Sequence, residues 1–199
     1  MSVAPRCAAA IAGLSAAAAF SFLVPAALAQ DAPPLAQTCA ACHGPGGRST
    51  DPAVPSLAGQ PKQFIATQLV MFREGNRKNP IMSPFAANLS NAELNLLAGY
   101  FSFQKAAPPG RAVSAEVSAT GRATAERLNC TLCHGPALLG QQHIPRLAGQ
   151  QAEYLRVQLR GFKASTRFDM DGQMTSAAQV LTPGDIDILA DYMASLPGP

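Results

Sequence analysis

The sequence predicts an all-α protein built from two tandem copies of one small unit, and three observations support this prediction. Segments of the chain recur at a nearly constant offset, as expected when a structural unit is duplicated. Apolar residues in each copy recur at helical spacing and do not alternate as they would in strands. A motif of two cysteines and one histidine also occurs once in each copy.

Composition excludes several classes of protein. Of the 199 residues, 48% are apolar and 14% are charged, which excludes wholesale disorder. No apolar stretch after the N-terminus reaches the ~20 residues of a membrane span. A formal net charge of +3 without a basic run does not indicate a nucleic-acid partner. Tryptophan is absent and aromatic residues make up only 6%, so something besides side chains is expected to fill the core.

The first 29 residues are predicted to be a signal peptide. Arg6 provides a short positive region, residues 8–24 are apolar apart from two serines, and residues 27–29 form an A-x-A cleavage site. Gly13 and Pro25 interrupt the apolar stretch, which favours a cleaved signal over a membrane anchor. We therefore predict export to the periplasm with cleavage near Ala29.

The repeat defines the remaining domains. PSLAGQPKQF at 55–64 matches PRLAGQQAEY at 145–154, and Met82 aligns with Met174 after a short insertion. Residues 106–117 are rich in Pro, Gly and Ala and are typical of a linker. We predict one domain at 30–105, this linker, and a second domain at 118–199.

Local signals predict the helices of each copy. Apolar residues at i, i+4 and i+7 form one helix face: Ile65, Leu69 and Phe72, and in the second copy Leu155, Leu159 and Phe162. Pro61 lies near the first turn of the first of these helices. A capping box then opens a last helix, at Ser90–Glu93 and, in the second copy, at Thr182–Asp185. A helix is also expected before each cysteine motif, most clearly from Thr120 to Asn129.

Removal of the signal peptide leaves four cysteines in two C-x-x-C pairs, each followed by His and Gly. The motifs read CAACHG at 39–44 and CTLCHG at 130–135. Three other interpretations of these motifs do not match the sequence. A zinc ribbon would place its cysteine pairs about 12 to 20 residues apart, much closer than they are here, and a thioredoxin-like dithiol would need a βαβ setting, which the flanking residues do not show. Simple disulfides would not explain the adjoining histidines.

Covalent haem c attachment explains all of these features. The two thiols add to the haem vinyl groups, and the histidine that follows ligates the iron. We therefore predict two haem c groups. One is attached at Cys39 and Cys42 with His43 on the iron, and the other at Cys130 and Cys133 with His134 on the iron.

With these motifs in place, the mature chain resembles the dihaem cytochrome c4 family, in which two class I cytochrome c-like domains follow one another, each wrapped around one covalently attached haem. In that family a proline carbonyl accepts a hydrogen bond from the iron-bound imidazole. The resemblance implies this role for Pro55 and Pro145, which follow their histidines by 12 and 11 residues. Such a bond orients the ring and raises its basicity.

Methionine is the expected second iron ligand, because Met/His ligation is typical of cytochromes c. Met82 and Met174 occupy equivalent repeat positions, in stretches expected to be loops, where the family places this ligand. Met170 is the rival of Met174, whereas Met71 and Met193 lie in predicted helices and are expected to pack in the core. His143, the remaining histidine, is expected to be a surface or locally hydrogen-bonded residue.

An iron with both axial positions filled transfers single electrons and has no free position for substrate. We therefore expect an electron carrier and not an enzyme. The family resemblance implies transfer from a quinol-oxidising complex to a terminal oxidase. Two alternatives stay open: an electron-accepting subunit of a periplasmic dehydrogenase, and a dihaem peroxidase, which the paired methionines disfavour. The expected partners are thus redox proteins, with a loose association with the membrane surface left open.

Basic residues flank both predicted sites. They are Arg48, Arg73, Arg77, Lys78, Arg156, Arg160, Lys163 and Arg167. Most are expected to be solvated charges, and the alternative is that some of them pair with haem propionates or steer partners.

Overall fold

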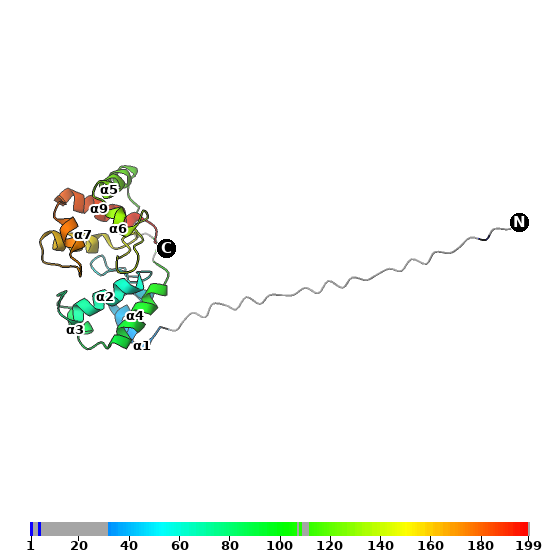
Figure 1. Ribbon diagram of the computed structural model, residues 1–199, viewed down its shortest axis with the longest axis horizontal. Coiled ribbons are helices and arrows are strands. Elements are labelled where there is room, and N and C mark those ends of the chain that lie inside the picture. The colour runs from blue at the N-terminus through cyan, green and yellow to red at the C-terminus, as the bar shows by residue number, and fades with distance from the viewer. Residues whose placement is uncertain (2–3, 5–31, 107, 109–111, 199) are drawn as a thin grey trace. The chain divides into compact units, whose positions relative to one another are not determined.

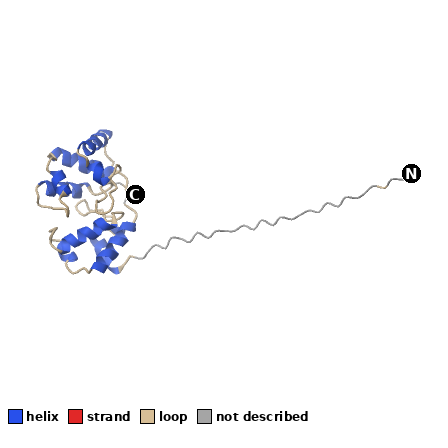
Figure 2. Ribbon diagram, viewed as in Figure 1, coloured by secondary structure: helices blue, strands red, loops and turns tan. Residues whose placement is uncertain are grey.

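The computed structural model describes residues 1, 4, 32–106, 108 and 112–198. Nearly all of the predicted signal peptide and part of the predicted linker lie outside these residues. Within the described part, the chain forms helices joined by loops, with one isolated bridge between Gln141 and Ile144 and no strand (Figures 1 and 2). The predicted all-α class is confirmed.

The helices follow the repeat. The first copy contains α1 (Pro34–His43), the 3-10 turn η1 (Pro45–Gly47), α2 (Lys62–Arg73), α3 (Met82–Ala86) and α4 (Asn91–Phe103). The second copy contains α5 (Ala115–Arg127), α6 (Cys130–His134), α7 (Ala152–Lys163), α8 (Gln173–Ala178) and α9 (Pro183–Ser195).

The predicted helix starts are present in α2, α4 and α9. Pro61 is the N-cap of α2. Ser90 accepts the backbone N–H of Glu93 at 3.3 Å, while the Glu93 carboxylate accepts the N–H of Ser90 at 2.8 Å. Thr182 and Asp185 form the same capping box at the start of α9. Each box satisfies backbone donors that the first helical turn leaves without partners.

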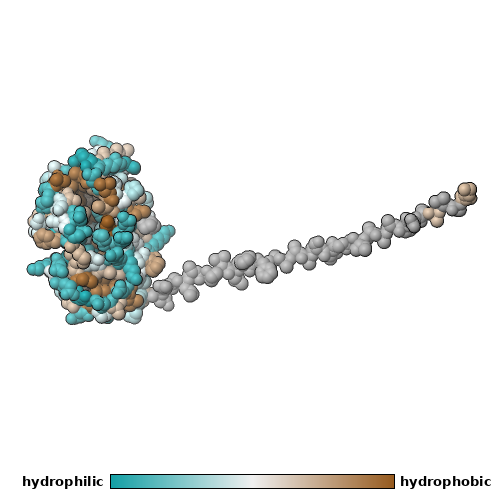
Figure 3. All heavy atoms as spheres, in the orientation of Figure 1, coloured by the Kyte–Doolittle hydropathy of each residue, from teal (hydrophilic) through white to brown (hydrophobic). Residues whose placement is uncertain are grey.

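Each copy has its own apolar core. In the first copy α2 packs against α4, around Ile65, Leu97 and Phe101. In the second copy α5 and α7 both pack against α9, around residues that include Leu155, Phe162, Ile186, Leu189 and Met193. Polar residues cover much of the visible face over these cores, with apolar residues between them (Figure 3).

The crossing of α5 and α9 depends on a glycine. A Cβ atom at Gly121 would lie 2.2 Å from Cβ of Tyr192, well inside van der Waals contact. Gly121 therefore allows the two helices to approach closely. Glycine is needed at this point although it lowers the stability of the helix that contains it.

Three elements differ from the sequence-based expectation. α5 begins at Ala115, after the N-cap Ser114, earlier than the expected Thr120 and inside the segment predicted as a linker. Asn129 adopts a left-handed conformation with φ of 59°, which separates α5 from α6. The short helices α3 and α8 lie in stretches that were expected to be loops.

No helix in the described residues is long and apolar enough to cross a membrane. The two copies contact each other through the loops that follow the cysteine motifs and through the starts of α2 and α7. Two backbone hydrogen bonds illustrate this contact, from Phe64 to Gln142 at 3.0 Å and from Tyr154 to Pro52 at 3.1 Å.

Candidate haem-binding sites

The two cysteine motifs lie on helices. In α1 the sequence of the motif places Cys39, Cys42 and His43 within one helical turn, so that the second thiol and the imidazole follow the first at i+3 and i+4. In the second copy, α6 carries Cys130, Cys133 and His134 in the same arrangement.

A glycine ends each of these helices. Gly44 and Gly135 have φ of 78° and 79°, a backbone conformation that residues with a side chain rarely adopt. A Cβ atom at Gly44 would lie 2.1 Å from the carbonyl oxygen of Arg48. The glycine that completes each C-x-x-C-H-G motif therefore allows the chain to turn away directly after the histidine.

Both histidines are oriented by a proline carbonyl, as the resemblance implies. Nδ1 of His43 lies 2.8 Å from the carbonyl oxygen of Pro55, and Nδ1 of His134 lies 2.9 Å from that of Pro145. Because a carbonyl oxygen only accepts, Nδ1 carries the proton and Nε2 keeps a lone pair. A neutral imidazole in this tautomer has the donor atom that a metal requires.

Burial favours the neutral form of these imidazoles. His43 is 5% exposed and His134 is 4% exposed. Burial lowers the pKa of both rings, although the hydrogen bond to the proline carbonyl acts in the opposite direction. The two rings are thus prepared as ligands and do not act as surface bases.

The four thiols are free and occupy matching environments. Cys39 and Cys130 are half-buried, whereas Cys42 and Cys133 are exposed, and none of the four forms a disulfide. Burial raises the pKa of the Cys39 and Cys130 thiols. In the described residues, no group of three or more His, Cys, Asp and Glu side chains could hold a metal ion. One imidazole beside two free thiols in each copy fits a haem attached through thioethers.

The two candidate methionines lie in the first turn of short helices, which corrects the expectation of loops. Met82 begins α3, where its N–H donates to Oδ1 of Asn79 at 2.8 Å. Met174 lies in α8, where its N–H donates to a carboxylate oxygen of Asp169 at 2.8 Å. Asn79 and Asp169, which accept these N–H groups, were missed by the sequence analysis, because they lie in the loops before the helices and neither is the N-cap residue.

The other methionines separate clearly by exposure. Met71 and Met193 are 3% and 2% exposed, so the expectation that they pack in the core is confirmed. Met170 is 68% exposed, whereas Met174 is partly buried against the core of the second copy. His143 is about half exposed, and its Nε2 lies 3.6 Å from the Asp171 carboxylate, as expected for a locally paired surface histidine.

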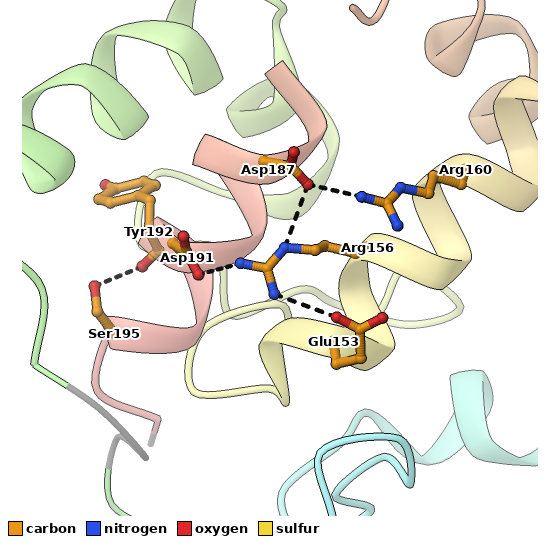
Figure 4. A network of polar contacts seen from close by, with 7 residues as sticks. All are labelled: Glu153, Arg156, Arg160, Asp187, Asp191, Tyr192 and Ser195. Carbon is orange, nitrogen blue, oxygen red and sulfur yellow. Dashed lines mark hydrogen bonds and ion pairs between the residues drawn. The ribbon is translucent and has the colours of Figure 1, made fainter. Parts of the chain in front are cut away.

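The flanking basic residues have several environments. Arg156 forms ion pairs with Glu153, Asp187 and Asp191, so that α7 is joined to α9 (Figure 4). Arg77 and Arg167 instead lie in a partly buried polar cluster between the two copies. Arg77, Arg156 and Arg167 are therefore not simply solvated charges, whereas Arg48, Lys78 and Arg160 are exposed, as expected.

Comparison with known proteins supports the same interpretation. Residues 29–101 match the family model described as cytochrome c oxidase, cbb3-type, subunit III, and residues 118–197 match the model described as cytochrome c. The chain is 37% identical over 180 residues to the thiosulfate dehydrogenase electron acceptor of Thiomonas intermedia, covering 83% of this chain and 82% of that protein. It is 35% identical over 169 residues to cytochrome c4 of Thiocapsa roseopersicina, covering 79% and 86%.

A solved structure gives the same result at the level of the fold. The cytochrome c4 structure from Acidithiobacillus ferrooxidans superposes with a TM-score of 0.72 at 31% identity, covering 80% of this chain and 99% of that chain. The family models extend over both copies and both cysteine motifs, and the relatives are named as cytochromes c4 and electron acceptors, which are electron carriers. The chain belongs to the dihaem cytochrome c4 family, and it is an electron-transfer protein with two covalently bound haem c groups.

Proposed function

We propose that this cytochrome is exported to the periplasm after cleavage near Ala29 and carries single electrons from a quinol-oxidising complex to a terminal oxidase. The observation that carries this proposal is the duplicated geometry of His43 and His134. Each ring is buried, oriented by a proline carbonyl, and has Nε2 available for iron. Two matched sites in one chain suit transfer between partners one electron at a time.

The proposed iron ligands are His43 with Met82, and His134 with Met174. Bound haem would supply one-electron chemistry at its iron. These four residues would hold the iron and leave no free position on it for water or substrate. The hydrogen bonds from the Met82 and Met174 N–H groups to Asn79 and Asp169 would hold the backbone of each methionine when the charge of the iron changes. The proposed attachment residues are Cys39 and Cys42, and Cys130 and Cys133.

A second candidate function has a specific observation in its favour. The relative from Thiomonas intermedia, which is 37% identical, is named as the electron acceptor of thiosulfate dehydrogenase. The same pair of sites would accept electrons from such a dehydrogenase as readily as from a quinol-oxidising complex. This candidate changes the electron donor and leaves the proposed ligands unchanged.

The donor can be identified by rapid mixing of the oxidised holoprotein with each candidate. One sample contains a quinol-oxidising complex with quinol, and the other contains a thiosulfate dehydrogenase with thiosulfate. Fast haem reduction in the first sample alone supports the respiratory proposal, and fast reduction in the second alone supports the dehydrogenase. Binding of carbon monoxide or turnover of peroxide by the native protein would contradict both, since either reaction requires an open iron.

A further inference from the structure

Two glutamine side chains join the two copies through their amide groups. Nε2 of Gln60 donates to the carbonyl oxygen of Arg146 at 2.9 Å, and its Oε1 accepts the backbone N–H of Arg146 at 3.0 Å. In the same way, Gln150 donates to the carbonyl oxygen of Ser56 at 2.9 Å and accepts the N–H of Ser56 at 2.8 Å. Each amide therefore binds one backbone residue of the other copy at both of its polar atoms, and Oε1 of Gln150 also accepts the N–H of Gln151 in its own copy.

These two contacts are related by exchange of the copies. Gln60 aligns with Gln150, and Ser56 aligns with Arg146. Gln60 of the first copy therefore binds Arg146 of the second copy, and Gln150 of the second copy binds the equivalent residue, Ser56, of the first copy. All four residues are at most 4% exposed. Burial raises the cost of leaving any of these polar atoms without a partner, which makes the paired arrangement specific.

The bound residues directly follow the prolines that orient the iron-binding histidines. The carbonyl of Pro55 and the N–H of Ser56 belong to one planar peptide group. That group accepts from Nδ1 of His43 at one end and donates to Oε1 of Gln150 at the other. The equivalent peptide group of Pro145 and Arg146 accepts from His134 and donates to Gln60.

We propose that Gln60 and Gln150 are positioning residues that act across the contact between the copies, each orienting the iron-binding histidine of the opposite copy. The proposal rests on the histidine ligands proposed above. Because the peptide group is planar, a glutamine that fixes its N–H also fixes the direction of its carbonyl and hence of the imidazole. Each haem environment is thereby set partly by the other copy.

The direction of the effect follows from polarisation along this chain of hydrogen bonds. A peptide group whose N–H donates to an acceptor has a carbonyl that accepts more strongly. A stronger bond from the imidazole raises the basicity of the ligand and favours the ferric iron. Loss of a glutamine should therefore reorient the histidine of the opposite copy and raise the reduction potential of that haem.

The contact between the copies contains a matched control. Nε2 of Gln151 donates to the carbonyl oxygen of Ser49 at 2.6 Å, also between the copies, but it does not bind either proline peptide group. A residue that merely holds the copies together would affect both haems alike, whatever its position. Gln60 and Gln150 should instead affect the opposite haem, and Gln151 should affect neither selectively.

The test uses the ferric holoprotein with Gln60→Met, Gln150→Met or the control Gln151→Met, which keep the side-chain length. Haem methyl shifts in paramagnetic proton NMR report the orientation of the iron ligands. Each set is assigned to its copy through nuclear Overhauser effects to the attachment cysteines of that copy, which are Cys39 and Cys42, or Cys130 and Cys133. Potentiometric titration follows the two potentials. We expect Gln60→Met to shift the methyl signals and raise the potential of the second haem, and Gln150→Met to do so for the first haem.

Shifts confined to the haem of the variant's own copy, equal shifts at both haems, or no shift would each overturn the proposal. Gln60→Glu adds a second variant of similar size and shape. It keeps an acceptor for the Arg146 N–H but turns a carboxylate oxygen toward the Arg146 carbonyl oxygen, so it should also disturb the second haem and leave the methyl signals of the first haem in place. A shift confined to the first haem would overturn the proposal as well. The crossed pattern depends only on the histidines. Failure of the proposed methionine ligands would therefore be seen separately, as loss of the thioether-to-iron absorption band in the unsubstituted protein.

Discussion

Arg77 and Arg167, at equivalent positions in the two copies, share the same pair of glutamine acceptors. Arg77 donates to Oε1 of Gln68 at 2.6 Å and to Oε1 of Gln158 at 2.9 Å. Arg167 donates to Oε1 of Gln158 at 2.6 Å and approaches Gln68 at 3.5 Å. Within the described part of the chain, no ion pair joins either guanidinium to a carboxylate. Two like charges thus lie close together between the copies.

The first prediction is that substituting both arginines lowers the free energy of unfolding by less than the sum of the two single substitutions. Burial, and secondly the charge of Arg77, lower the pKa of Arg167 to about 10. Arg77→Met or Arg167→Met alone should reduce the free energy of unfolding by about 1–3 kcal/mol, because each glutamine oxygen then keeps only one of its two arginine donors. The double variant should lose at least about 0.5 kcal/mol less than the sum, since each change relieves repulsion of the other charge.

Denaturant unfolding of the four holoproteins measures this coupling. Arg48→Met is the control, because Arg48 donates to the carbonyl of Lys105 at 3.3 Å, outside the cluster. The loss of unfolding free energy that it causes should simply add to the loss caused by Arg77→Met. Strict additivity of the two cluster variants would show that their guanidinium groups do not interact.

The second prediction concerns the ion-pair network that Arg156 forms in the second copy (Figure 4). The Arg156 position corresponds to Ala66 in the first copy. Its partners are between a third and a half exposed, so Arg156→Met should lose only about 1 kcal/mol of stability. Hydrogen exchange should become faster in α9 and stay unchanged in α4.

Salt distinguishes this ionic effect from loss of packing. Methionine keeps most of the apolar stem, and high salt screens partly exposed charges, so the loss should shrink as salt is added. Arg160→Gln is the matched control, because Arg160 is 56% exposed and pairs only with Asp187. Its effect should be smaller. A loss for Arg156→Met that is unchanged by salt would contradict the ionic interpretation.

Sequence reasoning was most successful where one local signal decides the outcome. Capping boxes such as Ser90–Glu93 and the apolar faces of α2 and α4 depend on spacing along one helix, which the sequence contains in full. The short helices α3 and α8 were missed because they have too few turns to show a period, and neither begins at a side-chain cap.

Contacts between the copies could not be predicted in the same way. The retained LAGQ segments indicated a repeat, but nothing in a single copy reveals that Gln60 binds the other copy at Arg146. The histidine and proline contacts were anticipated through family resemblance, because the 12-residue separation of His43 and Pro55 has no local periodicity. The sequence therefore predicted the helices better than it predicted the contacts between loops that lie far apart in the chain.

A third prediction concerns acid stability of the capping box at α9. Hydrogen bonds from Thr182 lower the pKa of Asp185 below its ordinary value of 3.8, with a smaller effect of Arg127 in the same direction. A carboxyl whose pKa is lowered in the fold stabilises the protein above its ordinary pKa. That contribution is lost as the pH falls through the lowered value.

Asp185→Asn should therefore reduce the free energy of unfolding by about 1 kcal/mol at neutral pH and by much less in acid below the lowered pKa. Denaturant midpoints at a series of pH values measure this difference. Glu126→Gln, at an exposed position of α5, should show no such trend. A difference that is constant across pH would argue that the carboxylate charge is irrelevant to the cap.

The last prediction separates Met174 from Met170 as the ligand of the second haem. Met174 is partly buried against the core of the second copy, and the Asp169 carboxylate accepts its N–H at 2.8 Å and that of Thr175 at 3.0 Å. Met170 is 68% exposed, and Asp169 and Asp171 flank it in the chain. Moving Met170 to a buried iron would bring these carboxylates toward an apolar haem, at a large desolvation cost.

Met174→Ala should therefore remove the thioether-to-iron absorption band of one haem and lower the potential of that haem, because thioether ligation raises it. Met170→Ala should leave both potentials and the spectrum nearly unchanged. Optical and EPR spectra recorded during potentiometric titration of the two variants measure both effects, with Met82→Ala as the corresponding change at the first haem. The reverse pattern would assign the ligand to Met170. An unchanged spectrum in both variants would mean that neither methionine ligates the second iron.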